Sequence, residues 1–152
     1  MGGNHDGIPG GLFNHCLRMY EALIALNKLI DNKYTKETLF LVAFCHDLCK
    51  VNIYKPKEKW HKEGRDWVST PGYEIVDDFP LGHGEKSLHI AYKYIELTKD
   101  EMLAIRHHMG AFCVGNIICP TERWSFNRAQ ELCPLVWLAN AADQTAVAMS
   151  AV

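Results

Sequence analysis

The sequence lacks the features that mark membrane proteins, secreted proteins and strongly charged binding proteins. Its longest uninterrupted apolar run, residues 39–45, is far shorter than the roughly 20 residues of a membrane-spanning helix. Residues 1–7 have neither a basic start nor an apolar stretch, so we expect no signal peptide. The formal net charge is only −2, which gives no general reason to expect nucleic acid or an anionic membrane as a partner. We therefore expect a cytoplasmic protein with no membrane partner.

The sequence also lacks a Cys-x-x-Cys pair, so we do not expect a structural zinc knuckle. Its six cysteines are Cys16, Cys45, Cys49, Cys113, Cys119 and Cys133. Reduced, buried thiols are the expectation for a cytoplasmic protein. Cys45 and Cys49 lie one helical turn apart around His46 and Asp47 and could approach a metal ion there, although thiolates beside histidine and aspartate ligands are unusual.

The chain has the length and composition of one domain over residues 1–152, with 48% hydrophobic and 22% charged residues. Apolar residues at helical spacing predict helices over 12–30, over 36–49 after an N-cap at Thr35, and over 85–97. A capping box from Thr98 to Glu101 begins another helix that stops at Gly110, and Pro134 suits the first turn of the last helix. Residues 1–11 are rich in glycine and are expected to be flexible. The prediction is an all-α bundle of five or six helices.

One long insertion, residues 51–82, interrupts the helical pattern. It is polar, rich in lysine and aromatic residues, and contains Pro56, Pro71 and Pro80, so we predict a loop with a hairpin turn at 70–72. Residues 111–126 are also predicted to be a loop. Because the insertion leaves directly from the helix that carries His46 and Asp47, it could cover a pocket and select a substrate. Its basic and aromatic residues could bind single-stranded nucleic acid, or it could be a solvated surface loop in which acidic residues dilute the charge.

The pair His46-Asp47 ends an apolar helical run, where an uncompensated charge would be costly and a partner or a metal ion is the usual remedy. Further imidazoles and carboxylates lie in or near the predicted helices, at His15, His83, His107, His108 and Asp143. Helical bundles build metal sites by delivering such side chains from several helices to one interior point. Imidazole and carboxylate together suit Fe, Mn, Zn, Co or Ni rather than Ca. The series therefore predicts a metal site.

The order of these residues resembles the HD-domain phosphohydrolase superfamily, whose hallmark is a His, then His-Asp, then a distant Asp. His15, His46-Asp47 and Asp143 match that hallmark. Gly82-His83-Gly84 and His107-His108 resemble the two additional histidines in HD domains of bacterial 3′-5′ exoribonucleases and cyclic-dinucleotide phosphodiesterases. The sequence departs from the family pattern in several ways: for example, no Gly-Tyr-Pro follows the paired histidines, and Cys49 stands where relatives often carry glycine.

The resemblance implies an HD-type helical fold with two divalent metal ions, with Fe or Mn favoured over Zn, Ni, Co or Mg. His15, His46, Asp47 and Asp143 would hold the first ion, and Asp47 would bridge to a second ion held by His83 and His107. We assign His107 rather than His108 because it matches the first histidine of the family's pair. His108 would then orient a ligand or face the phosphate of the substrate.

The implied reaction is hydrolysis of a phosphomonoester or phosphodiester, from a nucleotide or oligonucleotide, by a hydroxide that bridges the metal ions. The candidate catalytic residues are Asp47, Lys50 and His108. Lys50 could offer a cation to the phosphate, or it could be a solvated lysine that complements the helix dipole, and Arg106 has the same two interpretations. Two alternatives stay open: a di-iron oxygenase built on an HD scaffold, and a non-catalytic HD module that binds a nucleotide.

Overall fold

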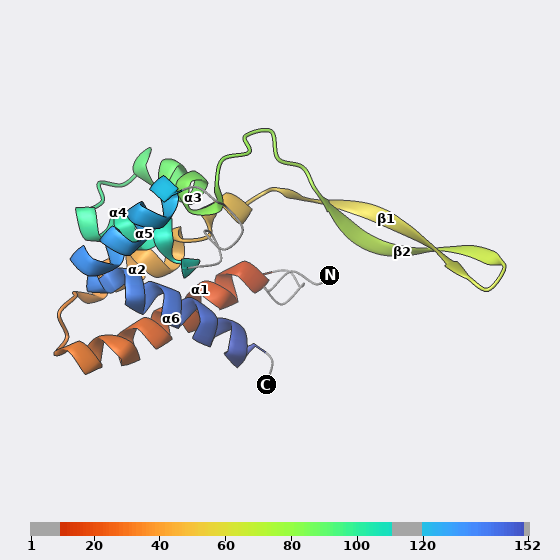
Figure 1. The fold of residues 1–152 in the computed structure, drawn as a ribbon. Coiled ribbons are helices and arrows are strands. Elements are labelled where there is room, and N and C mark those ends of the chain that lie inside the picture. The colour runs from red at the N-terminus through yellow and green to blue at the C-terminus, as the bar shows by residue number, and fades with distance from the viewer. Residues whose placement is uncertain (1–9, 111–119, 151–152) are drawn as a thin grey trace.

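The structure is a computed structural model that describes residues 10–110 and 120–150. Within these residues, six α-helices form a bundle, and a two-stranded antiparallel ribbon extends away from it (Figure 1). The helices are α1 (Gly11–Asn27), α2 (Lys36–Cys45), α3 (His83–Tyr92), α4 (Lys99–His107), α5 (Pro120–Leu132) and α6 (Pro134–Met149). The ribbon consists of β1 (Tyr54–Glu63) and β2 (Asp66–Ile75), and two 3-10 helices, η1 (Lys28–Ile30) and η2 (Leu48–Lys50), follow α1 and α2. The all-α prediction is thus corrected to a helical bundle with one small sheet.

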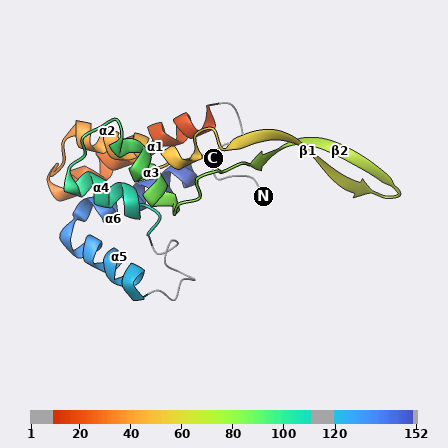
Figure 2. The same cartoon turned by 90° about the horizontal axis from the view of Figure 1, so that it is seen from above.

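The core lies where α1 packs against α2 on one side and α6 on another (Figures 1 and 2). Met19 and Leu23 are four residues apart in α1, so they share a helix face, and both are completely buried. They meet Leu39 and Val42 of α2 and Val136 of α6 in one apolar cluster. Burying each such side chain contributes about 1.5–3 kcal/mol. None of the helices in the described part of the chain has the length and apolarity to cross a membrane.

Local capping motifs begin two of the helices where the sequence places them. The Thr38 N–H donates to Thr35 Oγ1 at the start of α2, which confirms the predicted N-cap. At the start of α4, the Glu101 N–H donates to Thr98 Oγ1, and the Thr98 N–H donates to Glu101 Oε2. This reciprocal pair confirms the predicted capping box and fixes the start of the helix that ends beside His108.

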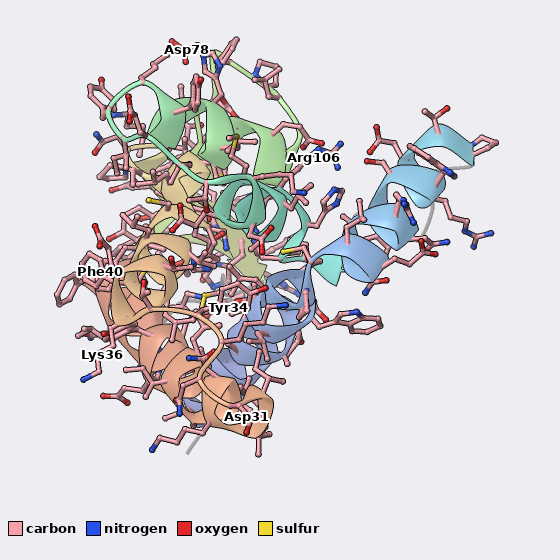
Figure 3. The ribbon with its side chains drawn as sticks, turned by 90° about the vertical axis from the view of Figure 1, so that its left-hand side faces the viewer. Asp31, Tyr34, Lys36, Phe40, Asp78 and Arg106 are labelled. Carbon is pink, nitrogen blue, oxygen red and sulfur yellow. The ribbon has the colours of Figure 1, made fainter. Side chains whose placement is uncertain are left out.

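Tyr34, in the turn between α1 and α2, is hydrogen-bonded to α4 and α6 (Figure 3). Its hydroxyl donates to Asp100 Oδ2 at 3.2 Å and accepts the Leu135 N–H at 3.3 Å. Its backbone exchanges two hydrogen bonds with the Asn27 side chain. The entry to α2 is thereby fixed relative to α4 and α6, two of the other helices that carry candidate site residues.

The ribbon turns at Gly64-Arg65, since Glu63 pairs with Asp66, and the predicted turn at 70–72 is wrong. A two-residue hairpin turn needs positive φ at one or both positions, and Gly64 has φ +63°. Pro71 lies within β2 opposite Glu58. A proline is tolerated there because each strand of an isolated two-stranded ribbon has an open edge that needs no hydrogen-bond donor.

Several helix boundaries also differ from the prediction. Residues 120–126, expected in a loop, belong to α5, whose polar sequence buries only Phe126 and Ala129 and so gives little periodic signal. Helix α3 begins two residues earlier than expected and ends at Tyr92 rather than near residue 97. The remainder of the predicted 111–126 loop and most of the glycine-rich segment 1–11 lie outside the described residues, although Gly11 already begins α1.

Helices α3 and α4 touch backbone to backbone at Gly84. A Cβ on this residue would lie 2.0 Å from the backbone oxygen of Arg106. Since the obstacle is main chain, it cannot move aside as a flexible side chain would. The close approach brings His83, the residue before Gly84, toward the end of α4.

Gly84→Ala is therefore expected to lower the free energy of unfolding by about 1–3 kcal/mol, the usual cost of overpacking. Urea denaturation followed by circular dichroism measures this change. Tyr92→Ala, at the exposed end of the same helix, is the control and should change stability little. An unchanged unfolding midpoint for Gly84→Ala would contradict the close crossing.

Candidate metal centre

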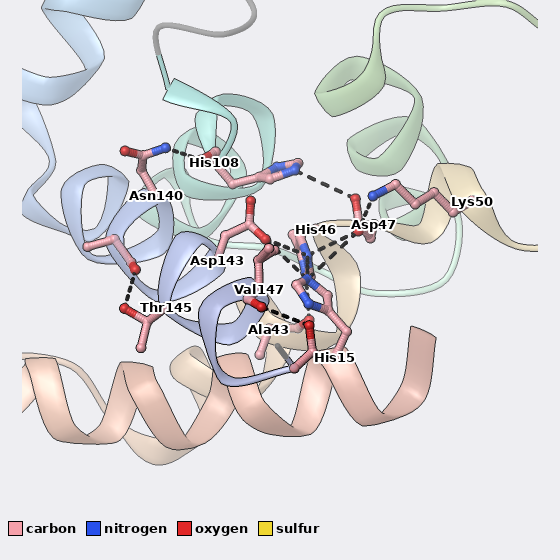
Figure 4. Close-up of polar contacts among 12 residues, drawn as sticks. His15, Ala43, His46, Asp47, Lys50, His108, Asn140, Asp143, Thr145 and Val147 are labelled. Atoms are coloured by element: carbon pink, nitrogen blue, oxygen red, sulfur yellow. Dashed lines mark hydrogen bonds and ion pairs between the residues drawn. The ribbon is translucent and has the colours of Figure 1, made fainter. Parts of the chain in front are cut away.

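Histidine and aspartate side chains from five parts of the fold meet at one interior point. Figure 4 shows those of α1, α4, α6 and the junction of α2 and η2. His15 comes from α1, His46 and Asp47 from the junction of α2 and η2, His83 from the first residue of α3, His108 from the end of α4, and Asp143 from α6. Asp47 has φ −112° and ψ 20°, outside the helical range, so the chain breaks its helix there. Its side chain is only 2% exposed.

One side of the Asp47 carboxylate faces two imidazoles. Asp47 Oδ2 lies 3.3 Å from His46 Nε2 and 4.0 Å from His15 Nε2. Asp143 Oδ1 lies 3.1 Å from His15 Nε2 and 3.9 Å from His46 Nε2, and the two Nε2 atoms are 3.1 Å apart. Ligands with bonds of about 2.1 Å to one ion lie about 3–4 Å from each other. The four side chains therefore have the spacing of one cation's ligand set.

The other side of the same carboxylate faces a second set of donors. His83 Nε2 lies 2.6 Å from Asp47 Oδ1, and His108 Nε2 lies 3.7 Å from it. Cys49 Sγ is 3.1 Å from His83 Nδ1. The two oxygens of Asp47 thus point at two different donor groups, which is the arrangement that a carboxylate bridging two cations needs.

Two of the rings are oriented by main-chain carbonyls. His46 Nδ1 lies 2.7 Å from Ala43 O, and His108 Nδ1 lies 2.8 Å from Ile105 O. A carbonyl can only accept, so Nδ1 carries the hydrogen in each ring, and the Nε2 lone pair of the neutral ring points into the site. This is the orientation that histidine ligands of metal ions commonly show.

The polarity of the site fits a divalent cation. His108 Nε2 is buried and has no hydrogen-bond partner within the described residues. Its lone pair, like that of His46, faces carboxylate oxygens, and two acceptors that face each other need a proton or a cation between them. Imidazole and carboxylate donors suit Fe, Mn, Zn, Co or Ni. The residues present therefore fit the metal ions that the sequence implies.

The protonation states of His46 and Asp143 also favour cation binding. Burial lowers the pKa of His46, and this outweighs the opposing effect of Asp47, so its imidazole is neutral near pH 7. Burial alone would raise the pKa of Asp143, but the hydrogen bond to His15 and the nearby His46 lower it, so the carboxylate is ionised. Burial opposes the charged form of His83, but its bonds to Asp47 and Cys49 outweigh burial and raise its pKa to about 9. A cation bound by this ring would therefore have to displace its proton.

Lys50 points into the site rather than into solvent (Figure 4). Its Nζ donates to Asp47 Oδ2 at 2.7 Å, and its side chain is 19% exposed. Lys50 is therefore not the solvated surface lysine that was one of the two interpretations of this residue. Lys50 stands at the edge of the donor cluster, where an ammonium group can contact an anion as well as Asp47.

The two adjacent histidines lie differently from the sequence-based assignment. His108 faces Asp47, whereas His107 turns away and packs its ring 5.8 Å from the ring of Phe126. Adjacent residues of a helix differ in direction by about 100°, so the two rings cannot both face the site. Burial and the neighbouring Arg106 guanidinium lower the pKa of His107 to about 4. His107 is therefore a neutral residue that lies outside the donor cluster, and His108 lies where the sequence-based assignment placed His107.

Arg106 serves as an ion-pair bridge between helices (Figure 3). Its Nη2 lies 2.6 Å from Glu85 Oε1 of α3 and 2.8 Å from Glu122 Oε2 of α5. With these two carboxylates it joins α4 to α3 and α5. The interpretation of Arg106 as a phosphate contact has no support in this arrangement.

Sequence reasoning missed one residue that holds the site in place. Asn140 Nδ2 donates to His108 O at 2.7 Å and so joins the end of α4 to α6. Asn140 stands three residues before Asp143, on the same face of α6, and this spacing was the signal that could have identified it.

The fold and the donors together define a helical bundle with an interior cluster of histidine and aspartate side chains that could hold a metal ion. In a comparison with protein families, the model of the HD domain matches residues 12–148. The chain therefore belongs to the HD domain family. This family is part of a superfamily of metal-dependent hydrolases. No curated protein and no solved structure gives a match.

Proposed function

We propose that the protein is a metal-dependent phosphohydrolase that cleaves a phosphomonoester or phosphodiester of a nucleotide or oligonucleotide. The observation that carries the proposal is the division of the Asp47 oxygens between two donor sets, with the Lys50 ammonium beside them. A phosphate group has several negatively charged oxygens, so a site that gathers divalent cations and a lysine is suited to it. Membership of the HD family supports the same class of reaction.

The two donor sets indicate which residues would bind each metal ion. His15, His46, Asp47 and Asp143 would hold one ion, and Asp47, His83 and His108 would hold a second. Fe or Mn is favoured, with Zn, Ni, Co or Mg as alternatives. Two divalent ions bound there would neutralise phosphate oxygens and lower the pKa of a water molecule.

Hydrogen bonds from the rest of the chain would hold the metal ligands in their binding orientations before the substrate arrives. The carbonyls of Ala43 and Ile105 hold the rings of His46 and His108 in their orientations, so little rearrangement is needed on binding. Asn140 holds the backbone of His108 against α6. Lys50 would orient the phosphate and share its charge.

Replacing Lys50 with methionine, which keeps the length of the side chain and removes its charge, tests this role. A hydrogen bond to a charged group contributes about 1.5–3 kcal/mol, so we expect kcat/KM to fall about 10–100-fold while the metal content stays unchanged. Steady-state kinetics with metal analysis of the same samples measures both quantities. Lys93→Met, at the exposed end of α3, is the control. Unchanged kinetics for Lys50→Met would exclude a contact with the phosphate.

The ribbon offers a surface beside this site for a longer substrate. Its ends join η2, which contains Lys50, and the segment that leads to His83 (Figure 1). The register places four aromatic residues on one face: Tyr54, Trp60, Trp67 and Tyr73. Their side chains are between 43% and 66% exposed, so they could stack on the bases of single-stranded nucleic acid. Basic and acidic residues nearly balance along the ribbon, so stacking would provide most of the affinity.

A double variant, Trp60→Ala with Trp67→Ala, tests whether the substrate is an oligonucleotide. Base stacking contributes about 1–3 kcal/mol per base, so we expect KM for a single-stranded oligonucleotide to rise about tenfold or more. Hydrolysis of bis-p-nitrophenyl phosphate, which is too small to reach the ribbon, should not change. Tyr94→Ala removes an exposed aromatic residue from the helical body and is the control. Equal KM values for the variant and the parent protein would exclude the ribbon as a binding surface.

The proposed function is tested by removing bound metal with a chelator and adding back single divalent metals. Hydrolysis of bis-p-nitrophenyl phosphate and of nucleotides should disappear and return, and it should proceed equally without oxygen. Activity that requires oxygen would favour an HD-type oxygenase instead. Nucleotide binding without turnover across all metals would favour a non-catalytic HD module.

A further inference from the structure

Cys49 lies against the Oδ1 half of the candidate metal centre. Its side chain is buried, and its Sγ lies 3.1 Å from His83 Nδ1 and 3.9 Å from His83 Nε2. Its backbone N–H donates to Ser87 Oγ at 3.1 Å. Because Ser87 and His83 are both in α3 and four residues apart, this bond fixes the thiol relative to the imidazole it approaches.

The thiol completes a compact group of donors. Ligand atoms of Asp47, Cys49 and His83 all lie within 4.8 Å of one another. In a tetrahedral zinc site, a sulfur bonded at about 2.3 Å and a nitrogen at about 2.1 Å lie about 3.5 Å apart. The 3.9 Å separation of Cys49 Sγ and His83 Nε2 is close to that value.

A second, independent feature points to a cation at the same place. His108 Nε2 is completely buried, lacks a hydrogen bond to any described residue, and lies 3.7 Å from Asp47 Oδ1. It faces the same carboxylate oxygen as His83. The ring of His108 lies 5.2 Å from the ring of His83, so the two imidazoles converge on one point.

Other described cysteines have different surroundings. Cys45, one turn earlier, packs in an apolar cluster with Ala91, Leu97 and Ile105. The Cys133 thiol donates to the Asp100 carbonyl at 3.7 Å. Neither belongs to a group of candidate ligands in the described parts of the chain, whereas Cys49 does.

We propose that Cys49 is a thiolate ligand of the ion on the Oδ1 side of Asp47, together with His83 and His108. On binding, the S–H bond breaks, a sulfur–metal bond forms, and the proton leaves to solvent. The inference rests on the proposed metal site, and it gives the two halves of that site different chemistry. The Oδ2 half offers nitrogen and oxygen donors, while the Oδ1 half adds sulfur.

This difference predicts that the two halves select different ions. Thiolate is a soft ligand that favours zinc, cobalt or ferrous iron over manganese or magnesium. The Oδ1 half should therefore take zinc in preference to manganese, whereas the Oδ2 half should discriminate less between them. The loaded protein would then contain two unlike metals when both are supplied.

Cobalt substitution tests the ligand directly, without an activity assay. The full-length protein, freed of metal, is titrated with Co²⁺ and followed by absorption. We expect a thiolate-to-cobalt charge-transfer band in the near ultraviolet that is lost in Cys49→Ser and retained in Cys45→Ala. Zinc affinity of the Oδ1 half should fall in Cys49→Ser by more than the 10–100-fold that is typical when a residue only orients a ligand. Circular dichroism confirms that each variant is folded.

The outcomes separate this inference from the proposed function. Two bound cobalt ions with visible-region bands and no charge-transfer band would overturn the thiolate assignment and leave the metal site standing. A band of equal strength in the parent protein and in Cys49→Ser would overturn it as well. Failure of the parent protein to bind any cobalt would overturn both the assignment and the metal site.

Discussion

Replacing Asp47 with asparagine is expected to empty both halves of the metal centre at once. The two Asp47 oxygens face different donor sets, so loss of the negative charge removes a ligand from each. Metal ions contribute several kcal/mol to charge stabilisation in phosphate hydrolysis, so the rate should fall by about 10³-fold or more. Metal analysis after dialysis and hydrolysis of bis-p-nitrophenyl phosphate measure the two effects.

Asp66→Asn is the matched control for this experiment. Asp66 is an exposed aspartate at the tip of the ribbon, opposite Glu63, so its replacement should change neither metal content nor rate. Circular dichroism of Asp47→Asn shows whether the helices persist. A folded Asp47→Asn protein that keeps its metal and most of its activity would exclude Asp47 as the bridging ligand.

The second large effect is expected from replacing the adjacent histidines one at a time. Their side chains point to different sides of the end of α4, so the two replacements should have different consequences. His108→Ala should lose the ion on the Oδ1 side and lower kcat by about 100-fold or more, since one of two charge-stabilising ions is gone. His107→Ala should keep both ions and most of the activity. It should lose stability instead, because His107 is buried against Phe126.

The comparison is made by metal analysis, kinetics and thermal melting of both variants. The account predicts that metal loss follows His108 and that loss of packing follows His107. The opposite pattern, with metal lost from His107→Ala and retained by His108→Ala, would show that the site is assembled differently in solution.

The sequence predicted those features that depend on neighbouring residues. The N-cap at Thr35 and the capping box at Thr98 use side chains within three positions of one another, so their motifs are visible in the chain. The residue series alone predicted a metal site, but the grouping of His15, His46 and Asp143 around one ion came from the resemblance to the HD family. No periodicity in the sequence places α1 beside α6.

The errors arose where tertiary packing decided between local alternatives. His107 and His108 are equivalent in composition, and the face of α4 that turns inward is set by its packing. Ala104 and Ile105 are completely buried, and His108 follows them by four and three residues, so the helical spacing did favour it. Matching the family's paired histidines by order alone overlooked that spacing.

The position of the turn in the ribbon was likewise decided by long-range pairing rather than by local sequence. The prediction considered only the turn at 70–72, although Gly64 is also a residue that turns favour. The long pairing of β1 with β2 selects the turn at Gly64-Arg65, because it leaves ten residues on each side in register. A strand with proline in its middle is unusual in a wide sheet, and the rule fails here since the ribbon has only two strands.

The most direct test of the central claim is a crystal structure of the protein grown with cobalt, with anomalous scattering recorded at the cobalt edge. The account predicts two anomalous peaks that flank the Asp47 carboxylate. One should lie within bonding distance of His15, His46 and Asp143, and the other within bonding distance of His83 and His108. No peak at this carboxylate under saturating cobalt, or peaks at other residues alone, would contradict the account.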